Sequence, residues 1–241
     1  MLITTNELRG RPVLASDGNL GRVEDFLFDD LNWVIRYMVT KTGSWLSNHL
    51  VLLSPHVLIK LDAKAKVVRV RMQRRQIEAS PPVEFHLPVS RAYEEKHYHY
   101  FGLPPYWVGS ALWGRSGYPL VAPPKGDPED YKLHFHREDR HLQSANSISG
   151  FRIESTDGAA GHLLGFWIND STWEVRDLVV RAGHWYTSRQ VLIAPASVTH
   201  ISYEDATVHV SLSKEDIQWA AEKGRAQVQA AQAATQRFSR E

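Results

Sequence analysis

Apolar and polar residues alternate along several short segments of the chain, and turn residues close each segment. In residues 67–73, the apolar Val68, Val70 and Met72 alternate with charged or amide side chains, which is the period of a strand with one buried face. Other β-prone segments stop at Gly, Pro or Asp, and they span 21–28, 33–40, 49–53 and 58–61. Five or six short strands at this spacing predict a small antiparallel barrel that is closed or nearly closed.

The chain also contains an internal repeat. A shift of 140 residues, without a gap, brings Trp33 onto Trp173 and Trp45 onto Trp185. The same shift aligns turn, strand and stop residues of the two copies: Gly10 with Gly150, Asp17-Gly18 with Asp157-Gly158, Gly21 with Gly161, Phe26 with Phe166, Asp30 with Asp170, Arg36 with Arg176, and Pro55 with Pro195. Tryptophans and glycines in one register exceed chance, so each copy is predicted to form one barrel.

Each copy resembles the PRC-barrel family. The residues that carry the resemblance in the first copy are Leu8-x-Gly10, Asp17-Gly18-x-x-Gly21, Phe26, Asp30 and Val51-Leu52-x-x-Pro55. The pattern covers roughly 1–80 and 143–215. The family is named after the cytoplasmic domain of the photosynthetic reaction centre H subunit and is similar to the C-terminal domain of a bacterial ribosome-maturation factor. Its motifs shape turns and core, so they indicate fold rather than function.

Two features depart from the reaction-centre subunit that this family includes. That subunit has a membrane-spanning helix before its barrel, whereas no apolar run of about 20 residues occurs in this sequence. The duplication is the second departure. We therefore predict a mainly β fold of two small antiparallel PRC-type barrels in tandem, with a partly helical connector and a C-terminal amphipathic helix. The predicted boundaries are 1–80 for the first barrel, 81–142 for the connector, 143–213 for the second barrel and 214–241 for the helix.

The connector has a composition of its own. Ser90 as an N-cap and Gly102 as a C-terminal stop predict a helix that ends near Phe101. The next stretch is dense in proline, glycine and aromatic residues, and its Trp107, Trp113 and Tyr118 have two interpretations. These side chains pack against the barrels, which is the more common role of a long loop, or they form an exposed patch for a partner.

The C-terminal helix is predicted from a capping box and an apolar seam. Ser213-x-x-Asp216 supplies the box. Mostly small residues recur at steps of four and three along the seam, at Ile217, Ala221, Gly224, Val228, Ala231, Thr235 and Phe238. The helix either lies on its own barrel or packs against a partner or a second copy of the chain. The candidate contact residues are Ile217, Val228 and Phe238.

Charge gives a local signal rather than a global one. The formal net charge is +1, so no overall field attracts nucleic acid or an anionic membrane. Basic residues gather at the end of the first copy, at Lys66, Arg69, Arg71, Arg74 and Arg75. They are interpreted either as a charged strand edge that resists aggregation or as a contact for phosphates or an acidic protein.

Histidine is the remaining candidate for chemistry. The sequence has 12 histidines and no cysteine. His134-x-His136, with His141 nearby, has the spacing of a metal site on a strand, although surface histidines are the more common interpretation. No phosphate loop, nucleophile elbow or dinucleotide fingerprint occurs. We therefore expect no enzyme activity and no cofactor.

These observations favour a protein-binding adaptor or assembly module, for which the resemblance implies a membrane-associated complex such as a reaction centre. The expected location is the cytoplasm, at a membrane surface in that case. The first alternative is an RNA- or ribosome-associated maturation factor, and the second is a histidine-based metal-binding protein. Nucleic acid is the less favoured partner because the net charge is so small.

Overall fold

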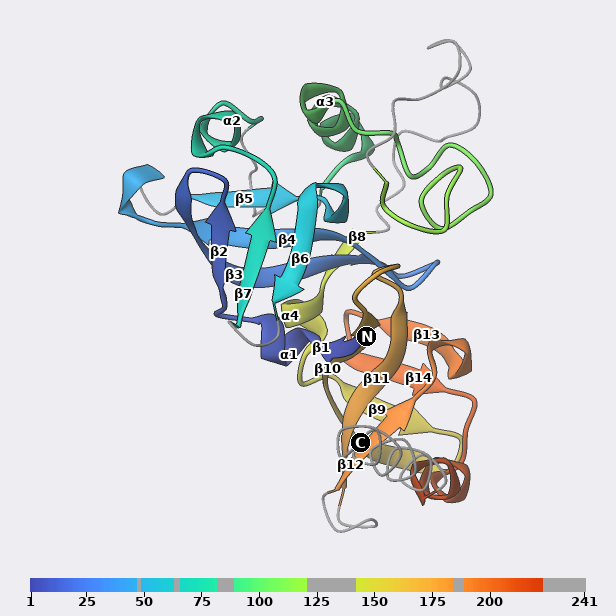
Figure 1. The fold of residues 1–241 in the computed structure, drawn as a ribbon. Helices are drawn as coiled ribbons and strands as arrows, with labels where there is room; N and C mark the ends of the chain where they lie inside the picture. Colours follow the sequence, from blue (N-terminus) through green and yellow to red (C-terminus); the bar gives the residue numbers. More distant parts are fainter. Residues whose placement is uncertain (47–48, 63–65, 82–88, 121–141, 184–188, 223–241) are drawn as a thin grey trace, which may run out of the picture. The chain divides into compact units, whose positions relative to one another are not determined.

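The computed structural model describes residues 1–46, 49–62, 66–81, 89–120, 142–183 and 189–222 (Figure 1). The chain divides into two compact units. The first unit comprises Met1–Ser147 and Ile168–Val175, and the second comprises Ile148–Trp167 and Arg176–Glu241.

The first unit is built on a seven-stranded sheet with the order β5-β4-β3-β2-β7-β6, and β8 pairs with β3 beside this path. Its strands are β2 (Pro12–Ala15), β3 (Gly18–Asp29), β4 (Val34–Thr42), β5 (Leu50–Leu53), β6 (Leu58–Asp62), β7 (Val67–Val70) and β8 (Leu142–Ser144). Its helices are α1 (Thr5–Leu8), α2 (Arg74–Glu78) and α3 (Arg91–Phe101), with the short 3-10 turns η1 (Ser44–Leu46) and η2 (Pro55–Val57).

A second seven-stranded sheet has the order β12-β11-β10-β9-β14-β13, and β1 (Leu2–Thr4) pairs with β10, a strand that the two units share. Its other strands are β9 (Arg152–Ser155), β10 (Gly158–Asn169), β11 (Val175–Ala182), β12 (Gln190–Ile193), β13 (Val198–Ser202) and β14 (Thr207–Val210). The short helix α4 (Ala145–Ile148) precedes β9, and the turn η5 (Pro195–Ser197) precedes β13.

The two sheets correspond strand by strand. Shifting β3 by 140 residues reproduces the bounds of β10, and the same holds for β5 with β12 and β7 with β14. The order of the corresponding strands is also the same in both sheets. The chain is therefore mainly β, and the repeat seen in the sequence is a repeat of structure.

Two features of the sheets differ from the predicted antiparallel barrels. β2 pairs with β7 in parallel, and β9 pairs with β14 in parallel, so the prediction of a wholly antiparallel sheet is wrong at this step in each copy. The pairs β2–β3, β3–β4, β4–β5 and β6–β7 are all antiparallel, so β7 runs parallel to β2 because the chain does not reverse direction where it passes from β5 through η2 into β6. Within the described residues, no strand pairing joins β5 to β6 or β12 to β13, so hydrogen bonds do not close either sheet.

The repeated glycines follow from close backbone contact. Gly21 lies in β3 opposite Thr42 of β4, and a Cβ atom at Gly21 would lie 2.0 Å from the carbonyl oxygen of Lys41. At Gly161 the corresponding distance, to the carbonyl oxygen of Arg181, is 2.1 Å. Only glycine permits such an approach of two strands.

Both helices that the caps predict are present. α3 has Ser90 as its N-cap and the left-handed Gly102 as its C-cap. The helix at 214–222 starts with the predicted box, in which the Asp216 amide donates to the Ser213 hydroxyl at 3.1 Å and the Ser213 amide donates to the Asp216 carboxylate at 3.0 Å. In the part of the chain that the structure describes, no helix is long and apolar enough to cross a membrane.

Candidate functional site

The connector after α3 packs its aromatic side chains into the first unit. Tyr106 and Trp113 are buried, with 6% and 2% of their surface exposed. The Trp113 indole N–H donates to the carbonyl oxygen of Thr172 at 2.7 Å, within the same unit. Trp107 is half-buried, and its ring contacts those of Tyr98 and Tyr106. The packing interpretation of these aromatic residues is therefore the one that the structure supports for Trp107 and Trp113.

An ion pair lies beneath this connector. Asp29 ends β3 and Arg36 lies in β4, and their side chains are 6% and 3% exposed. The Arg36 Nη2 and Nε groups donate to Asp29 Oδ2 at 3.0 and 3.3 Å. The other oxygen, Oδ1, accepts the amide protons of Leu31 and Asn32, which shapes the turn between the strands. Burial alone would raise the pKa of Asp29, but Arg36 and the bonds from Asn32 lower it below its usual value.

Arg36 also contacts the connector. Its guanidinium carbon lies 3.9 Å from the centre of the Tyr106 ring and 5.1 Å from that of Trp113. Its Nη1 group donates to the carbonyl oxygen of Leu112. A guanidinium has five N–H groups, so these bonds and those to Asp29 leave two of them without a partner among the described residues. Arg36 is held rigidly and keeps donors for a further acceptor.

A second buried network involves Arg91 and Glu94 at the start of α3. Arg91 Nη1 lies 2.8 Å from Glu94 Oε2 and donates to the Tyr106 hydroxyl at 3.1 Å. Glu94 Oε1 accepts protons from the hydroxyls of Tyr106, at 2.8 Å, and Tyr37, at 3.0 Å. Burial raises the pKa of Glu94, and Arg91 and the tyrosine bonds offset this in part. Burial and then Glu94 raise the pKa of both tyrosines, so their hydroxyls stay protonated and donate.

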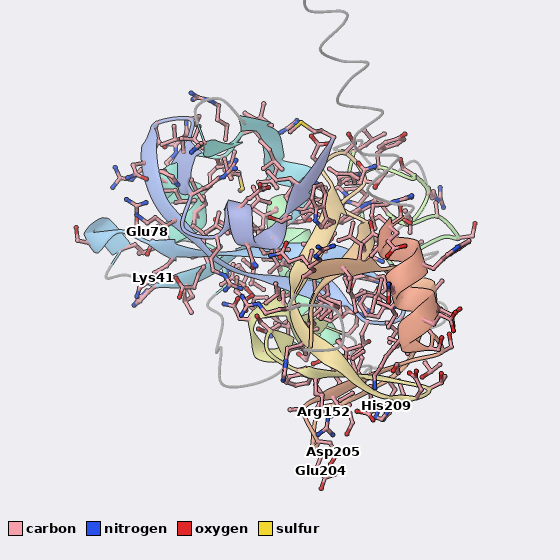
Figure 2. The ribbon with its side chains drawn as sticks, turned by 90° about the horizontal axis from the view of Figure 1, so that it is seen from below. Lys41, Glu78, Arg152, Glu204, Asp205 and His209 are labelled. Atoms are coloured by element: carbon pink, nitrogen blue, oxygen red, sulfur yellow. The ribbon has the colours of Figure 1, made fainter. Side chains whose placement is uncertain are left out.

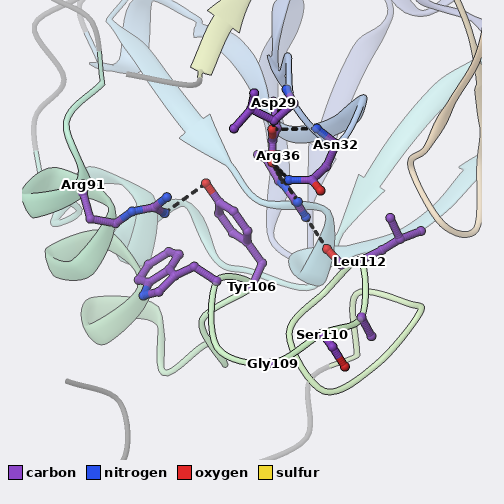
Figure 3. Close-up of a pocket in the computed structure, with 11 residues that line it drawn as sticks. Asp29, Asn32, Arg36, Arg91, Tyr106, Gly109, Ser110 and Leu112 are labelled. Atoms are coloured by element: carbon purple, nitrogen blue, oxygen red, sulfur yellow. Dashed lines mark hydrogen bonds and ion pairs between the residues drawn. The ribbon is translucent and has the colours of Figure 1, made fainter. Parts of the chain in front are cut away.

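The two networks border one pocket of about 290 Å³ (Figure 3). Its lining comes from Asp29, Leu31 and Asn32 after β3, Arg36 of β4, Arg91 of α3, and Tyr106, Trp107 and 109–112 of the connector. Figure 3 shows Arg91 bonded to the Tyr106 hydroxyl and Arg36 bonded to the carbonyl oxygen of Leu112. The pocket thus combines two cationic groups with aromatic walls, which suits an anionic group attached to an apolar one.

The second copy does not repeat the buried ion pair of Asp29 and Arg36. Asn169 and Thr172 stand where the first copy has Asp29 and Asn32. Arg176, which corresponds to the buried Arg36, is exposed. The pocket is therefore an elaboration of the first copy, built where the connector packs against it.

Two histidines are buried near the pocket in the first unit. The Nε2 group of His97, in α3, donates a hydrogen bond to the carbonyl oxygen of Leu52 at 3.0 Å. The His56 ring lies edge-on to the ring of Trp113. Burial lowers the pKa of each to about 4, so both are neutral at pH 7. The Nδ1 atom of His97 and the Nε2 atom of His56 have no hydrogen-bond partner among the described residues. These histidines are core residues.

The predicted partner-binding residues are placed in different environments. Trp113 is buried, and so is Ile217 at 1% exposed, so neither offers a surface to a partner in this structure, whereas Tyr118 is 53% exposed. Val228 and Phe238 lie outside the described residues, as do the metal candidates His134, His136 and His141. The Arg36–Arg91 pocket was not predicted, because its residues come from separate segments of the chain.

The predicted basic group is present on β7 and α2. Lys66, Arg69, Arg71 and Arg75 are exposed, and Arg74 is half-buried. Val68 and Val70 face the core, so Arg69 projects from the opposite face of β7, and Arg71 follows directly after the strand. The backbone N–H of Arg74 donates to the carboxylate of Asp17 at 2.9 Å. These side chains therefore offer positive charge to solvent on one side of the first unit.

Comparison with known families assigns the first copy to a domain family. Residues 2–84 match the family model of the PRC-barrel domain, and these residues form such a domain. The match covers β1 to β7 and α2. No curated protein matches the sequence.

Proposed function

We propose that the protein is a non-enzymatic adaptor of two PRC-type barrels that binds another protein, and that the Arg36–Arg91 pocket receives an acidic group of that partner. The PRC-barrel match covers the first copy. The second copy is included in the proposal because its strands have the same order and lengths at a shift of 140 residues.

The observation that carries the proposal is the elaboration of the first copy. α3 and the connector follow the PRC-barrel domain in the sequence, and they complete a pocket on it that contains two buried guanidinium groups. A connector that only covered the sheet would need no buried arginines, since burying charge costs free energy even when it is paired. This free-energy cost is explained if the two buried guanidinium groups bind a ligand.

An acidic group is the ligand that this chemistry fits. Arg36 keeps N–H groups beyond those bound to Asp29 and Leu112, and arginine forms paired hydrogen bonds with a carboxylate. Asp29 itself accepts five hydrogen bonds and has little capacity for another donor. At the rim, Leu31 is 66% exposed and offers an apolar contact. A peptide with an acidic residue beside an apolar one would bind the N–H groups of Arg36 and contact Leu31.

The proposal is tested by capture of partners from native cells after gentle solubilisation of the membranes. Ser110 is exposed and lines the pocket, so Ser110→Glu places a carboxylate where the partner's acid would bind without changing the core. Ser147 is also exposed but does not line the pocket, which makes Ser147→Glu the matched control. We expect wild type and Ser147→Glu to capture the same proteins, insensitive to nuclease, and Ser110→Glu to lose them. Equal capture by all three would contradict the assignment of the pocket.

A second candidate function is association with RNA or the ribosome, and the exposed Arg69 in β7 and Arg71 directly after it support this function. Contacts with phosphates weaken steeply as salt concentration rises. In this case ribosomal proteins would be captured, would be lost after nuclease treatment or at moderate salt, and would be absent when Arg69, Arg71, Arg74 and Arg75 are neutralised. Capture that survives both treatments rejects this candidate.

A further inference from the structure

Two histidines lie directly opposite each other in the second unit. His200 of β13 and His209 of β14 are register partners in an antiparallel pair. Their rings are 5.7 Å apart between centroids and lie within 25° of parallel. Side chains in such opposite positions have Cβ atoms about 5 Å apart. The strand register therefore brings together two imidazoles that are separated in the sequence by a turn.

The pair faces solvent. Val208 and Val210 are buried on either side of His209, so the His209 side chain projects from the opposite face of β14. His200 is exposed, and β13 is the last strand in the order of this sheet. A register shift between Val198 and His200 marks an irregularity next to the pair. The His200 ring is therefore open to solvent, and the half-buried His209 ring is so in part.

Acidic residues lie near the pair. β9 is the other neighbour of β14 in the sheet, and its Glu154 is the register partner of His209. Glu204 and Asp205 are exposed in the turn that joins β13 to β14. Figure 2 shows His209 on the same side of the second unit as Arg152, Glu204 and Asp205. The turn carboxylates provide negative potential that attracts a cation.

The first copy provides a comparison. At a shift of 140 residues, Lys60 and Arg69 occupy the positions of His200 and His209, and they are register partners too. The first copy therefore has two basic residues at this pair of register positions, and the second copy has two residues that bind metal when neutral. The same strand pair carries different chemistry in the two copies.

We infer that His200 and His209 form a two-histidine site for a first-row transition-metal ion that prefers imidazole, with Zn²⁺ or Cu²⁺ as the expected ligand. In a tetrahedral zinc site with bonds of about 2.0–2.1 Å, two imidazole nitrogens lie roughly 3.3 Å apart. The ring centroids are 5.7 Å apart, so binding requires each side chain, the exposed His200 and the half-buried His209, to rotate until one nitrogen of each ring reaches this separation. Water completes the coordination. The bound ion ties the terminal strand β13 to β14.

The test is a titration of the full chain with ZnCl₂ by calorimetry. The decisive variant is His200→Lys with His209→Arg, which installs the residues that the first copy carries at these positions. The matched control is His162→Lys, because His162 is exposed on β10 and has Arg152 as its register partner. We expect the double variant to bind one Zn²⁺ fewer per chain than wild type. The control is expected to bind the same number as wild type.

A second measurement identifies the ligands of the bound ion directly. Pulsed electron paramagnetic resonance of wild type with one equivalent of Cu²⁺ is expected to detect two imidazole ligands, and the double variant is expected to lose this signal. Zinc binding that is unchanged in the double variant would overturn the inference. A single imidazole on the tightest-bound Cu²⁺ would do so as well.

Discussion

The buried pair of Asp29 and Arg36 gives the sharpest test of how the pocket is built. Asp29→Asn removes the charge but keeps a side-chain oxygen for the turn. Asn169, at the corresponding position of the second copy, accepts the amide protons of Ser171 and Thr172 at 2.9 and 3.3 Å. The variant should therefore retain the turn and leave Arg36 buried without its counter-ion. Removing one partner of a buried ion pair costs about 3–5 kcal/mol, and we expect a loss near the lower limit because the turn bonds remain.

The free energy of unfolding is measured by urea denaturation at pH 7. Hydrogen exchange of peptides from residues 21–42 then shows that the loss occurs in the first unit. The matched control is Arg176→Met, because Arg176 is the exposed counterpart of Arg36 and its replacement should change stability by about 0.5 kcal/mol or less. Adding Arg36→Met to Asp29→Asn should restore much of the stability, since no charge then stays buried. A loss below about 1 kcal/mol in Asp29→Asn would refute the assigned role of the pair.

The pH dependence of this effect has a definite sign. The pKa of Asp29 is lower in the folded protein than its ordinary value of 3.8. Its contribution is therefore present at neutral pH and is lost as the pH falls below about 4, where the carboxylate becomes protonated. The difference in stability between wild type and Asp29→Asn should consequently shrink in that range.

Three further predictions concern the first unit. Burial lowers the pKa of His56 and His97 to about 4 in the folded protein from 6.5 in the unfolded chain, so the free energy of unfolding measured with urea should fall as the pH decreases from 6.5 to 4, by roughly 3 kcal/mol or less for each histidine, and His97→Phe should flatten this dependence. Gly21→Ala should destabilise the sheet by more than about 2 kcal/mol in thermal denaturation, because its Cβ would overlap the Lys41 carbonyl, whereas Gly10→Ala, with open space around it, should cost less. Trp113→Phe removes the hydrogen bond to Thr172 and should cost about 1–3 kcal/mol in urea denaturation, while an unchanged midpoint would show that this bond does not anchor the connector.

Local signals in the sequence predicted much of the fold. The shift of 140 residues found the repeat because turns and core positions recur, and the structure reproduces it in the strand bounds. Ser90 and Gly102 bracket α3 because capping is a property of a few adjacent residues. The parallel pairing of β2 with β7 was missed, because alternation of apolar and polar residues does not distinguish parallel from antiparallel neighbours.

The candidate sites could not be predicted in the same way. The pocket joins Asp29, Arg36, Arg91 and the connector, which lie far apart in the sequence and meet only when the connector packs. One signal was available: the turn residue Asp29 is replaced by Asn169 in the second copy, while Arg36 is retained as Arg176. The pairing of His200 with His209 likewise depends on a strand register that the sequence does not specify.

The measurement that tests the adaptor proposal most directly is photo-crosslinking in native cells from the pocket itself. A photoreactive phenylalanine analogue replaces Ser110, which lines the pocket, and in a separate variant it replaces Ser147, which does not. We predict a discrete crosslinked protein from position 110 only, with the crosslink mapped to a segment that contains an acidic residue beside an apolar one. The same products from both positions, or none from position 110, would contradict the proposal that this pocket binds a partner.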